Sequence, residues 1–224
     1  MIYNTDKILE DFDGTLPIFS ISNFVMFPRT SYNFNIFEPQ YKDMITDILK
    51  SNKLFSINNK IKSKDSKICS TGTLCQIIES KKLDNGNYAI IASGLKKIKI
   101  INFLDNQKKD YDSATVEIIE ENDVINDEEL KRKKLINKFL TLVSSGQEKL
   151  NPSVIDASMI SSETLTNLAS LILPLKSDDK QKLLELNDIQ LRLEVLCQFL
   201  DSELKVESDL VNFNQIIPTN IRWN

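Results

Sequence analysis

The sequence predicts an α+β fold in which a strand-rich first part with one helix precedes a helical second part. Residues Tyr32 to Ile36 alternate apolar and polar side chains, as a strand with one buried face does. Pro39 follows where the first turn of a helix accepts proline, and apolar residues then recur at helical spacing from Tyr41 to Leu49. From about residue 122 the alternation gives way to helical spacing.

The strand-rich part is expected to contain further strands on both sides of this helix. The apolar run from Phe24 to Phe27 ends at Pro28 and predicts a strand before Tyr32. Further strands are predicted at Leu54–Ile57, Ile68–Ile78, Tyr88–Ile91, Ile98–Ile100 and Thr115–Ile118. Asp84-Asn85-Gly86 predicts a hairpin turn, because Asn-Gly readily takes positive φ, and residues 58–67 are expected to form a loop.

Two glycines indicate special backbone geometry in these strands. Gly72 predicts a bulge or a close backbone approach, because glycine is otherwise unfavourable inside a strand. Gly94 predicts a turn or bend before Ile98. Both glycines are expected to serve backbone geometry, and a binding role for the edge that they shape is the alternative.

The second part is expected to contain four helices. The first begins near Asp127, the second ends at Pro174, the third opens at Ser177 and the fourth is capped by Asp188. The fourth carries one apolar stripe, formed by Ile189, Leu193, Leu196, Leu200 and Leu204. The predicted division is therefore a strand-rich part at 1–121, a helical part at 122–205 and a tail at 206–224.

Composition restricts the compartment and the class of partner. Apolar residues make up 41% of the chain, enough for a core, and an odd number of cysteines, three, favours free thiols in a reducing compartment. No basic start followed by an apolar stretch is present, so we expect a cytoplasmic protein without a membrane segment. Residues 1–121 hold 16 basic and 16 acidic side chains, and the whole net charge of −4 lies in residues 122–224. No nucleic-acid surface is predicted.

The absence of histidine from the sequence excludes several chemistries. Ser-His and Cys-His nucleophilic pairs, histidine metal sites and imidazole acid-base catalysis all require that side chain. The cysteines lack CxxC spacing, which argues against zinc, and no G-x-x-x-x-G-K-[ST] stretch predicts a phosphate-binding loop. Carboxylate or Ser-Lys chemistry needs no histidine, but no spacing points to it, and scattered Asp and Glu are typical of a solvated surface. We therefore expect no catalytic residues, no metal and no cofactor, and a protein that is not an enzyme.

Several stretches together resemble the N-terminal, substrate-binding domain of the Lon protease family, also known from free-standing bacterial LON-domain proteins. They are Leu16–Phe19 with Val25–Pro28, Ile36–Tyr41, Gly72–Ile77, Gly94–Ile100, and Lys180–Glu185 with Arg192-Leu193. Their order and spacing resemble the family from residue 14 to residue 204. The family usually has arginine where this chain has Gln40, which puts any ion pair through that position in doubt.

The resemblance implies a small pseudo-barrel of strands joined to a C-terminal helical bundle. Full Lon proteases continue into an ATPase module and a Ser-Lys peptidase, and neither is expected here. What the resemblance leaves is a non-catalytic module that recognises other polypeptides, including unfolded or aggregation-prone segments, through a surface between strands and helices. The alternative is a structural adaptor for one folded protein, bound through the helices or the tail. A third hypothesis is a small-molecule binder, which one tryptophan, Trp223, and five tyrosines do little to support. Self-association is left open.

Five aromatic residues are the candidates for contact with a bound polypeptide: Phe24, Phe27, Phe37, Tyr41 and Trp223. Aromatic residues between strands more often belong to the core, so only a subset is expected at the surface. Six residues are expected to define the structural motif: Pro28, Glu38, Pro39, Gly72, Gly94 and Arg192. Glu38 could contact a partner, but a carboxylate at a helix start more simply stabilises the positive end of the helix dipole.

Overall fold

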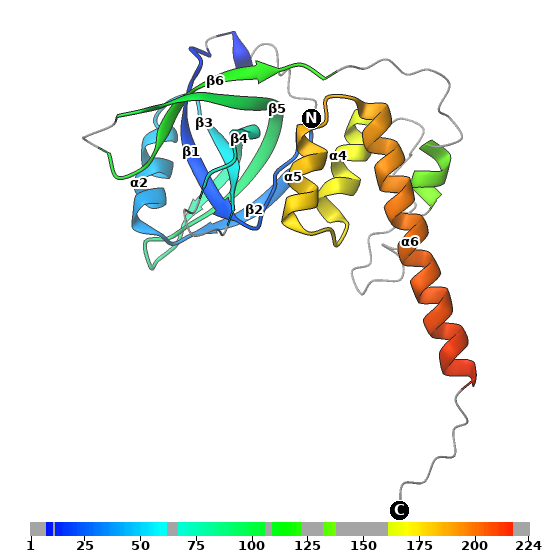
Figure 1. The fold of residues 1–224 in the computed structure, drawn as a ribbon. Coiled ribbons are helices and arrows are strands. Elements are labelled where there is room, and N and C mark those ends of the chain that lie inside the picture. Colours follow the sequence, from blue (N-terminus) through cyan, green and yellow to red (C-terminus); the bar gives the residue numbers. More distant parts are fainter. Residues whose placement is uncertain are drawn as a thin grey trace, which may run out of the picture.

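The computed structural model describes residues 8–10, 12–61, 67–105, 109–121, 132–137 and 161–216, with backbone alone beyond residue 202. The strands are β1 (Thr15–Ser22), β2 (Ser31–Ile36), β3 (Leu54–Lys60), β4 (Thr71–Lys82), β5 (Tyr88–Leu104) and β6 (Ser113–Ile119). The named helices are α2 (Pro39–Ile48), α4 (Ser162–Ile172), α5 (Ser177–Glu185) and α6 (Ile189–Ile216). Figure 1 shows the strands as one body, with α2 on the far side of it from α4 and α5. The predicted order of a strand-rich part before helices is confirmed.

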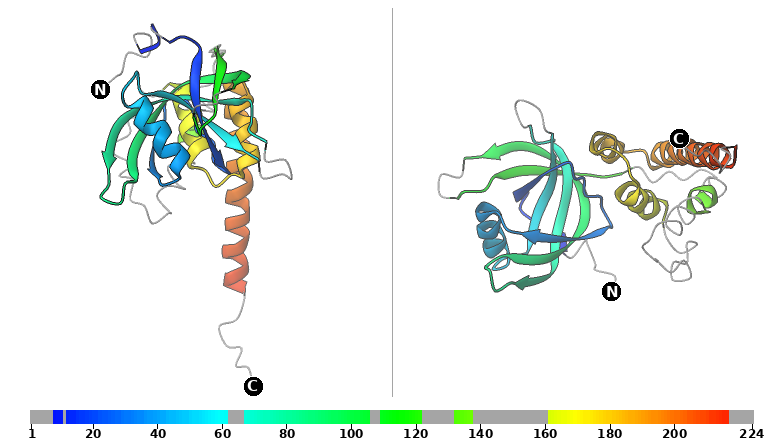
Figure 2. Two further views of the ribbon diagram at one scale, coloured as in Figure 1. Left: turned by 90° about the vertical axis from the view of Figure 1, so that its left-hand side faces the viewer. Right: turned by 90° about the horizontal axis from the view of Figure 1, so that it is seen from below.

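The strands form one curved sheet in the order β2-β5-β4-β3-β1-β6, and β5 also pairs with β6. The long strand β5 makes both connections, because its residues Tyr88–Ser93 pair with β2 and its residues Lys97–Leu104 pair with β6. The pairing of β5 with β6 closes a barrel, seen end-on in Figure 2. β1 pairs with β6 only through Thr15–Pro17, whereas Ile18–Ser22 pair with β3 alone. The barrel is therefore open beside the second half of β1.

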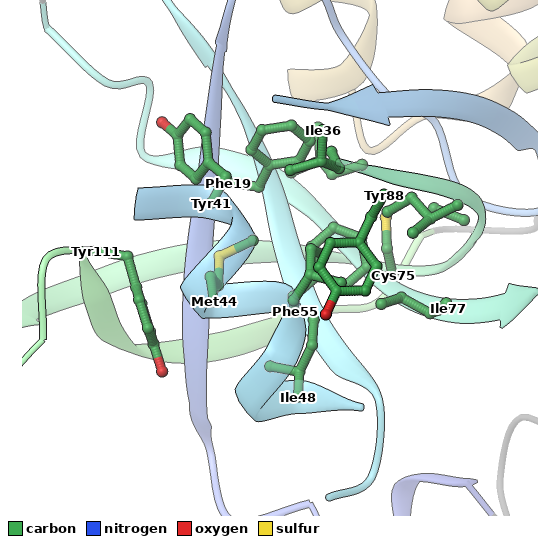
Figure 3. Packing of buried hydrophobic residues seen from close by; sticks show 14 of the residues in the cluster. Phe19, Ile36, Tyr41, Met44, Ile48, Phe55, Cys75, Ile77, Tyr88 and Tyr111 are labelled. Atoms are coloured by element: carbon green, nitrogen blue, oxygen red, sulfur yellow. The ribbon is translucent and has the colours of Figure 1, made fainter. Parts of the chain in front are cut away.

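Helix α2 covers part of this body and contributes to its core. Pro39 stands at the first turn, and Glu38 precedes it with extended backbone and no side-chain cap hydrogen bond. Met44 and Ile45 are completely buried. Figure 3 shows Met44 directed toward the aromatic residues of the strands. Burying an apolar side chain of this size stabilises the fold by about 1.5–3 kcal/mol.

A second core cluster joins the strand body to the later helices. It is composed of Val25, Phe27, Leu135, Leu165, Ala169, Leu173, Leu183, Leu184, Leu193, Leu196, Cys197 and Leu200. Val25 and Phe27 come from the first part of the chain, and the other residues come from the second. The two parts therefore share one apolar interface.

The strand predicted at Phe24–Phe27 is wrong. β1 already ends at Ser22, and Asn23 turns the chain with a φ of 60°. The hydroxyl of Thr73 donates to the Met26 carbonyl at 2.7 Å, and the hydroxyl of Thr30 donates to the Phe27 carbonyl at 2.7 Å. Side-chain donors thus satisfy these buried carbonyls in irregular backbone, which the apolar composition of the run does not reveal.

Other elements differ from expectation in extent. β3 continues to Lys60, into the first residues of the loop predicted at 58–67, and Asn58 is buried. Gly94 lies inside β5 rather than at a turn between strands. Glycine is required there because a Cβ would come within 2.3 Å of the Phe27 carbonyl oxygen. A Cβ on Gly72 would lie 2.4 Å from the Asn58 amide nitrogen, which accounts for the second glycine. The Asp84–Gly86 turn is confirmed, with Gly86 at a φ of 78°.

The predicted helices of the second part are described only in part. The first shows residues 132–137 as helix, and the rest of it lies outside the described residues. α4, α5 and α6 match the other three, and the amide of Leu191 bonds the Asp188 side chain at 3.0 Å as expected for a cap. α6 continues to Ile216, past the boundary expected at 206. A complete bundle over 122–205, and the three-part division, stay predictions.

Candidate polypeptide-binding groove

A groove opens where the barrel is not closed, between β1, β2 and the start of α2. Its volume is about 350 Å³. Phe19–Ser22 of β1 form one wall and Phe34–Ile36 of β2 form another. Phe37, Glu38, Gln40 and Tyr41 close it at the start of α2, and Lys60 adds the end of β3. We call this site the aromatic groove.

Aromatic rings run continuously from the base of the aromatic groove to the surface. The Phe19 ring lies 4.6 Å from the Tyr41 ring and 5.7 Å from the Phe34 ring, both edge-on. Phe24 continues the series, with centroids 5.4 Å from Phe34 and 4.8 Å from Tyr32. Tyr41 and Phe19 are buried, whereas Tyr32 is 44% exposed. The edge-on contacts of Phe19 hold the base of the groove rigid, and the series reaches the surface at Tyr32, outside the groove lining.

Phe37 is the most exposed of the predicted binding residues that the structure describes, at 65%. It stands between β2 and α2, where the turn into the helix directs it away from the core. Phe24 is half-buried against the core, and its ring makes an edge-on contact with the ring of Phe34. Of the predicted set, Phe37 and Tyr41 thus line the groove, and Phe24 contacts it only through the ring of Phe34.

Phe27 and Tyr41 both belong to the buried core. Phe27 is completely buried in the cluster shared with the later helices, so its side chain is not available at the surface. Tyr41 is largely structural, since its hydroxyl donates to the Ser20 carbonyl at 3.0 Å and ties α2 to β1. Trp223 lies outside the described residues.

Two charged side chains line the groove without an ion pair among the described residues: Glu38 and Lys60. Glu38 is exposed and receives only a long hydrogen bond, 3.4 Å, from the Gln40 amide. Its backbone carbonyl accepts from the amides of Tyr41 and Lys42, which begins α2. The groove therefore offers one negative and one positive group.

The structural-motif residue Arg192 organises a buried network between the strand body and the helices. Its guanidinium donates to the carbonyls of Leu183 at 3.0 Å and Leu186 at 2.5 Å, and to the side chains of Asn167 and Glu121. The Lys97 amine, also buried, lies 2.8 Å from Oε1 of Glu121. We call Lys97, Glu121, Asn167 and Arg192 the junction network.

The electrostatics of the junction network favour a charged carboxylate. Burial by itself raises the pKa of Glu121, but Arg192 and Lys97 together hold that pKa below its usual range. Burial lowers the pKa of Lys97, against the opposing effect of Glu121. Neither Lys97 nor Glu121 was singled out from the sequence, because their partners are far away along the chain.

The surface between strands and helices, where binding was expected, is already occupied by paired charges. A pocket of about 240 Å³ lies there, bordered by Pro28 and Ile189. Three ion pairs line it: Arg29–Glu163 at 2.7 Å, Lys96–Glu120 at 3.0 Å and Lys97–Glu121 at 2.8 Å. The exposed ring of Phe37 lies instead at the aromatic groove, beside α2.

The described residues give no sign of a metal centre or a membrane span. Within them, no group of three or more Cys, Asp or Glu side chains is placed to hold a metal ion. No helix in the part of the chain described is long and apolar enough to cross a membrane. All three cysteines are buried.

Comparison with known proteins identifies the family. A family profile described as the ATP-dependent protease La (LON) substrate-binding domain matches residues 15–202. The Lon protease of Brevibacillus choshinensis is 34% identical over 143 residues, which cover 62% of this chain and 18% of that protein. The Lon protease of Buchnera aphidicola is 25% identical over 198 residues, which cover 85% of this chain and 25% of that protein. The chain thus spans a quarter or less of these relatives.

Solved structures share the fold. The N-terminal domain of the Mycobacterium avium complex Lon protease superposes with a TM-score of 0.66 at 15% identity, covering 84% of this chain and 98% of that domain. A Lon N-terminal domain protein from Xanthomonas campestris gives a TM-score of 0.61 at 17% identity, covering 81% and 96%. With the profile match, these observations show that the chain belongs to the LON substrate-binding domain family.

Proposed function

We propose that this chain is a non-catalytic module that recognises exposed apolar segments of other polypeptides through the aromatic groove. The observation that carries the proposal is Phe37, which is 65% exposed at the rim of a groove of about 350 Å³. Burying a phenylalanine side chain against a partner stabilises a complex by about 1.5–3 kcal/mol. Aromatic residues set beside a pocket are also frequent hot spots of interfaces.

The family supports the same class of function. The matching profile is named for substrate binding in an ATP-dependent protease, and the curated relatives are Lon proteases, whose substrates are polypeptides. Only the substrate-binding domain of that family is matched here. We infer that clients are unfolded or aggregation-prone chains, that the module acts in the cytoplasm, and that it contributes no catalytic step of its own.

The groove also matches the physical demands of such clients. A module that reads unfolded chains must accept apolar side chains without requiring one sequence, and rings at the mouth provide a contact surface of this kind. The rigid base, held by Phe19 and Tyr41, limits the loss of side-chain entropy on binding. Glu38 and Lys60 then bias the choice among apolar segments.

Replacing Phe37 by alanine tests the proposal. We expect Phe37→Ala to weaken binding of a reduced and alkylated, permanently unfolded model protein by about tenfold or more, with little change in melting temperature. The matched control is Phe103→Ala on β5, because Phe103 is also exposed, at 52%, and does not line the groove. Equal affinity of the Phe37 variant and the wild type for the unfolded chain would overturn the proposal.

The adaptor function stays the alternative, because α6 projects beyond the rest of the described structure (Figures 1 and 2). An adaptor would hold one folded protein through this helix or the residues after it. Removing residues 206–224 while the groove is intact distinguishes the two functions. Loss of a stoichiometric folded partner, with unchanged binding of unfolded chains, would favour the adaptor.

A further inference from the structure

Strand β2 has an outer edge that no described strand covers. It stands at the end of the strand order and pairs only with β5. Among the residues that the structure describes, no backbone hydrogen bond joins its other edge to another segment. Such an edge presents amide and carbonyl groups with which a further strand can pair.

The β2 edge also lacks the usual protections against pairing. Its sequence, Ser-Tyr-Asn-Phe-Asn-Ile, contains no charged residue and no proline. Its register with β5 is regular from Ser31 to Ile36, without a bulge. Natural edge strands commonly carry one of these features to prevent unwanted pairing. Their joint absence here indicates an edge that is available for pairing.

The open edge adjoins the aromatic groove. Phe34, Asn35 and Ile36 of β2 line the groove, and Phe19–Ser22 of β1 form its opposite wall. Those β1 residues pair only with β3, so β6 does not fill the space beside them. Successive side chains of a strand point to opposite faces. A segment lying along β2 therefore directs every second side chain toward the groove.

The charges of the groove define the rest of the ligand. Glu38 follows directly on β2, whereas Lys60 ends β3, and both line the groove without an ion pair among the described residues. A segment that crosses the groove meets both groups. Complementary charge on the segment, one basic and one acidic residue, would then be favourable and would fix its direction.

We propose that polypeptides bind this domain by strand addition: an extended segment pairs with the outer edge of β2 and places alternate apolar side chains in the aromatic groove. A basic residue of the segment faces Glu38 and an acidic residue faces Lys60. This inference rests on the proposed function and specifies its ligand as an extended strand. Backbone pairing supplies affinity that is independent of sequence, as recognition of varied chains requires.

The test uses a short labelled peptide in which valine and threonine alternate between a terminal lysine and a terminal aspartate, together with the peptide of reversed charge order. Two N-methylated versions are compared by fluorescence anisotropy, one methylated at the valines and one at the threonines. The amides of successive residues point to opposite edges of a strand, so all valine amides face one edge and all threonine amides the other. Strand addition therefore predicts that one version loses about tenfold or more in affinity while the other binds nearly as the parent does.

Hydrogen exchange locates the pairing on the protein. Binding of the parent peptide should slow exchange of the amides in residues 31–36, where an uncovered edge otherwise exchanges with solvent. If these amides slow with protein concentration alone, a second copy of the chain occupies the edge, and the proposal is overturned. The same holds if both methylated peptides bind as the parent does while Phe37→Ala still weakens binding, an outcome that leaves the proposed function intact.

A charge reversal tests the predicted contact with Glu38. Glu38→Lys should weaken binding of the parent peptide by severalfold, and replacing the peptide lysine by glutamate should restore it. Asp43→Lys serves as the control, because Asp43 is also an exposed carboxylate and does not line the groove. Equal loss with both peptides contradicts the charge assignment. If no peptide binds and Phe37→Ala leaves the affinity for unfolded chains unchanged, the proposed function fails as well.

Discussion

The junction network and the aromatic groove use the same kinds of residues in opposite ways. At the junction, Lys97 and Arg192 are completely buried and both contact Glu121. At the groove, Glu38 and Lys60 face open space without an ion pair among the described residues. A charged group whose partners are internal fixes the arrangement of strands and helices, whereas one without internal partners is available to a ligand. Charge therefore separates a structural region from the proposed binding region.

The phenylalanines repeat this contrast. Phe27 is completely buried between the strand body and the helices, whereas Phe37 is 65% exposed at the groove. Residue type and position in the same short stretch do not distinguish them. Their surroundings distinguish them, because the backbone of Phe27 packs closely against Gly94 of β5. Changes at the two regions should accordingly separate stability from binding.

The largest expected effect is at the junction network. Glu121→Gln removes a carboxylate that contacts two buried cations, and removing a partner from a buried ion pair costs about 3–5 kcal/mol. We expect a loss of this size in the free energy of unfolding in urea. The matched control is its neighbour Glu120→Gln, whose side chain is 75% exposed and whose pair with Lys96 is worth about 0–1 kcal/mol. Similar losses for both variants would contradict the distinction.

Phe27→Ala is expected to have a similar or slightly smaller effect. The variant leaves a cavity between Val25 and the residues of α4 and α6, and truncating a buried phenylalanine costs about 3–5 kcal/mol. Phe37→Ala should change the free energy of unfolding by about 0.5 kcal/mol or less, because that ring is exposed. Urea unfolding of both variants checks the contrast. A large loss of stability in Phe37→Ala would show that this ring serves the core.

The sequence predicted the elements that depend on local pattern. β2, α2 and the turn at Gly86 follow from alternation, from Pro39 and from Asn-Gly, each of which acts within a few residues. The run Phe24–Phe27 was wrongly predicted as a strand, because an irregular segment buried between two apolar clusters needs the same apolar residues as a strand does. Its backbone geometry depends on Thr30 and Thr73, and the latter is 47 residues away from Met26.

The sequence predicted the kind of candidate site, an aromatic surface, but not its position in the fold. The motif that contains Phe37 and Glu38 was identified, but the sequence does not show which aromatic residues reach the surface. The junction network was missed because Arg192 meets Asn167 across 25 residues and Glu121 across 71 residues. No spacing rule connects positions that tertiary packing alone brings together. For the same reason the binding surface was expected between strands and helices, where the structure has paired charges.

The smallest expected effect is the pH dependence of the junction. The pKa of Glu121 is lower in the folded protein than its ordinary value of 4.5, so its contribution to stability is complete above about pH 4.5 and is lost as pH falls through the folded pKa. The stability difference between the wild type and Glu121→Gln should therefore persist at pH 5 and shrink in more acidic solution. Urea unfolding between about pH 3 and pH 7 measures this difference, with Glu120→Gln as the control. A difference that shrinks already between pH 7 and pH 5 would contradict the charged junction. If peptide binding at the proposed groove stays unchanged between pH 7 and pH 5, the groove and the junction network respond to pH independently.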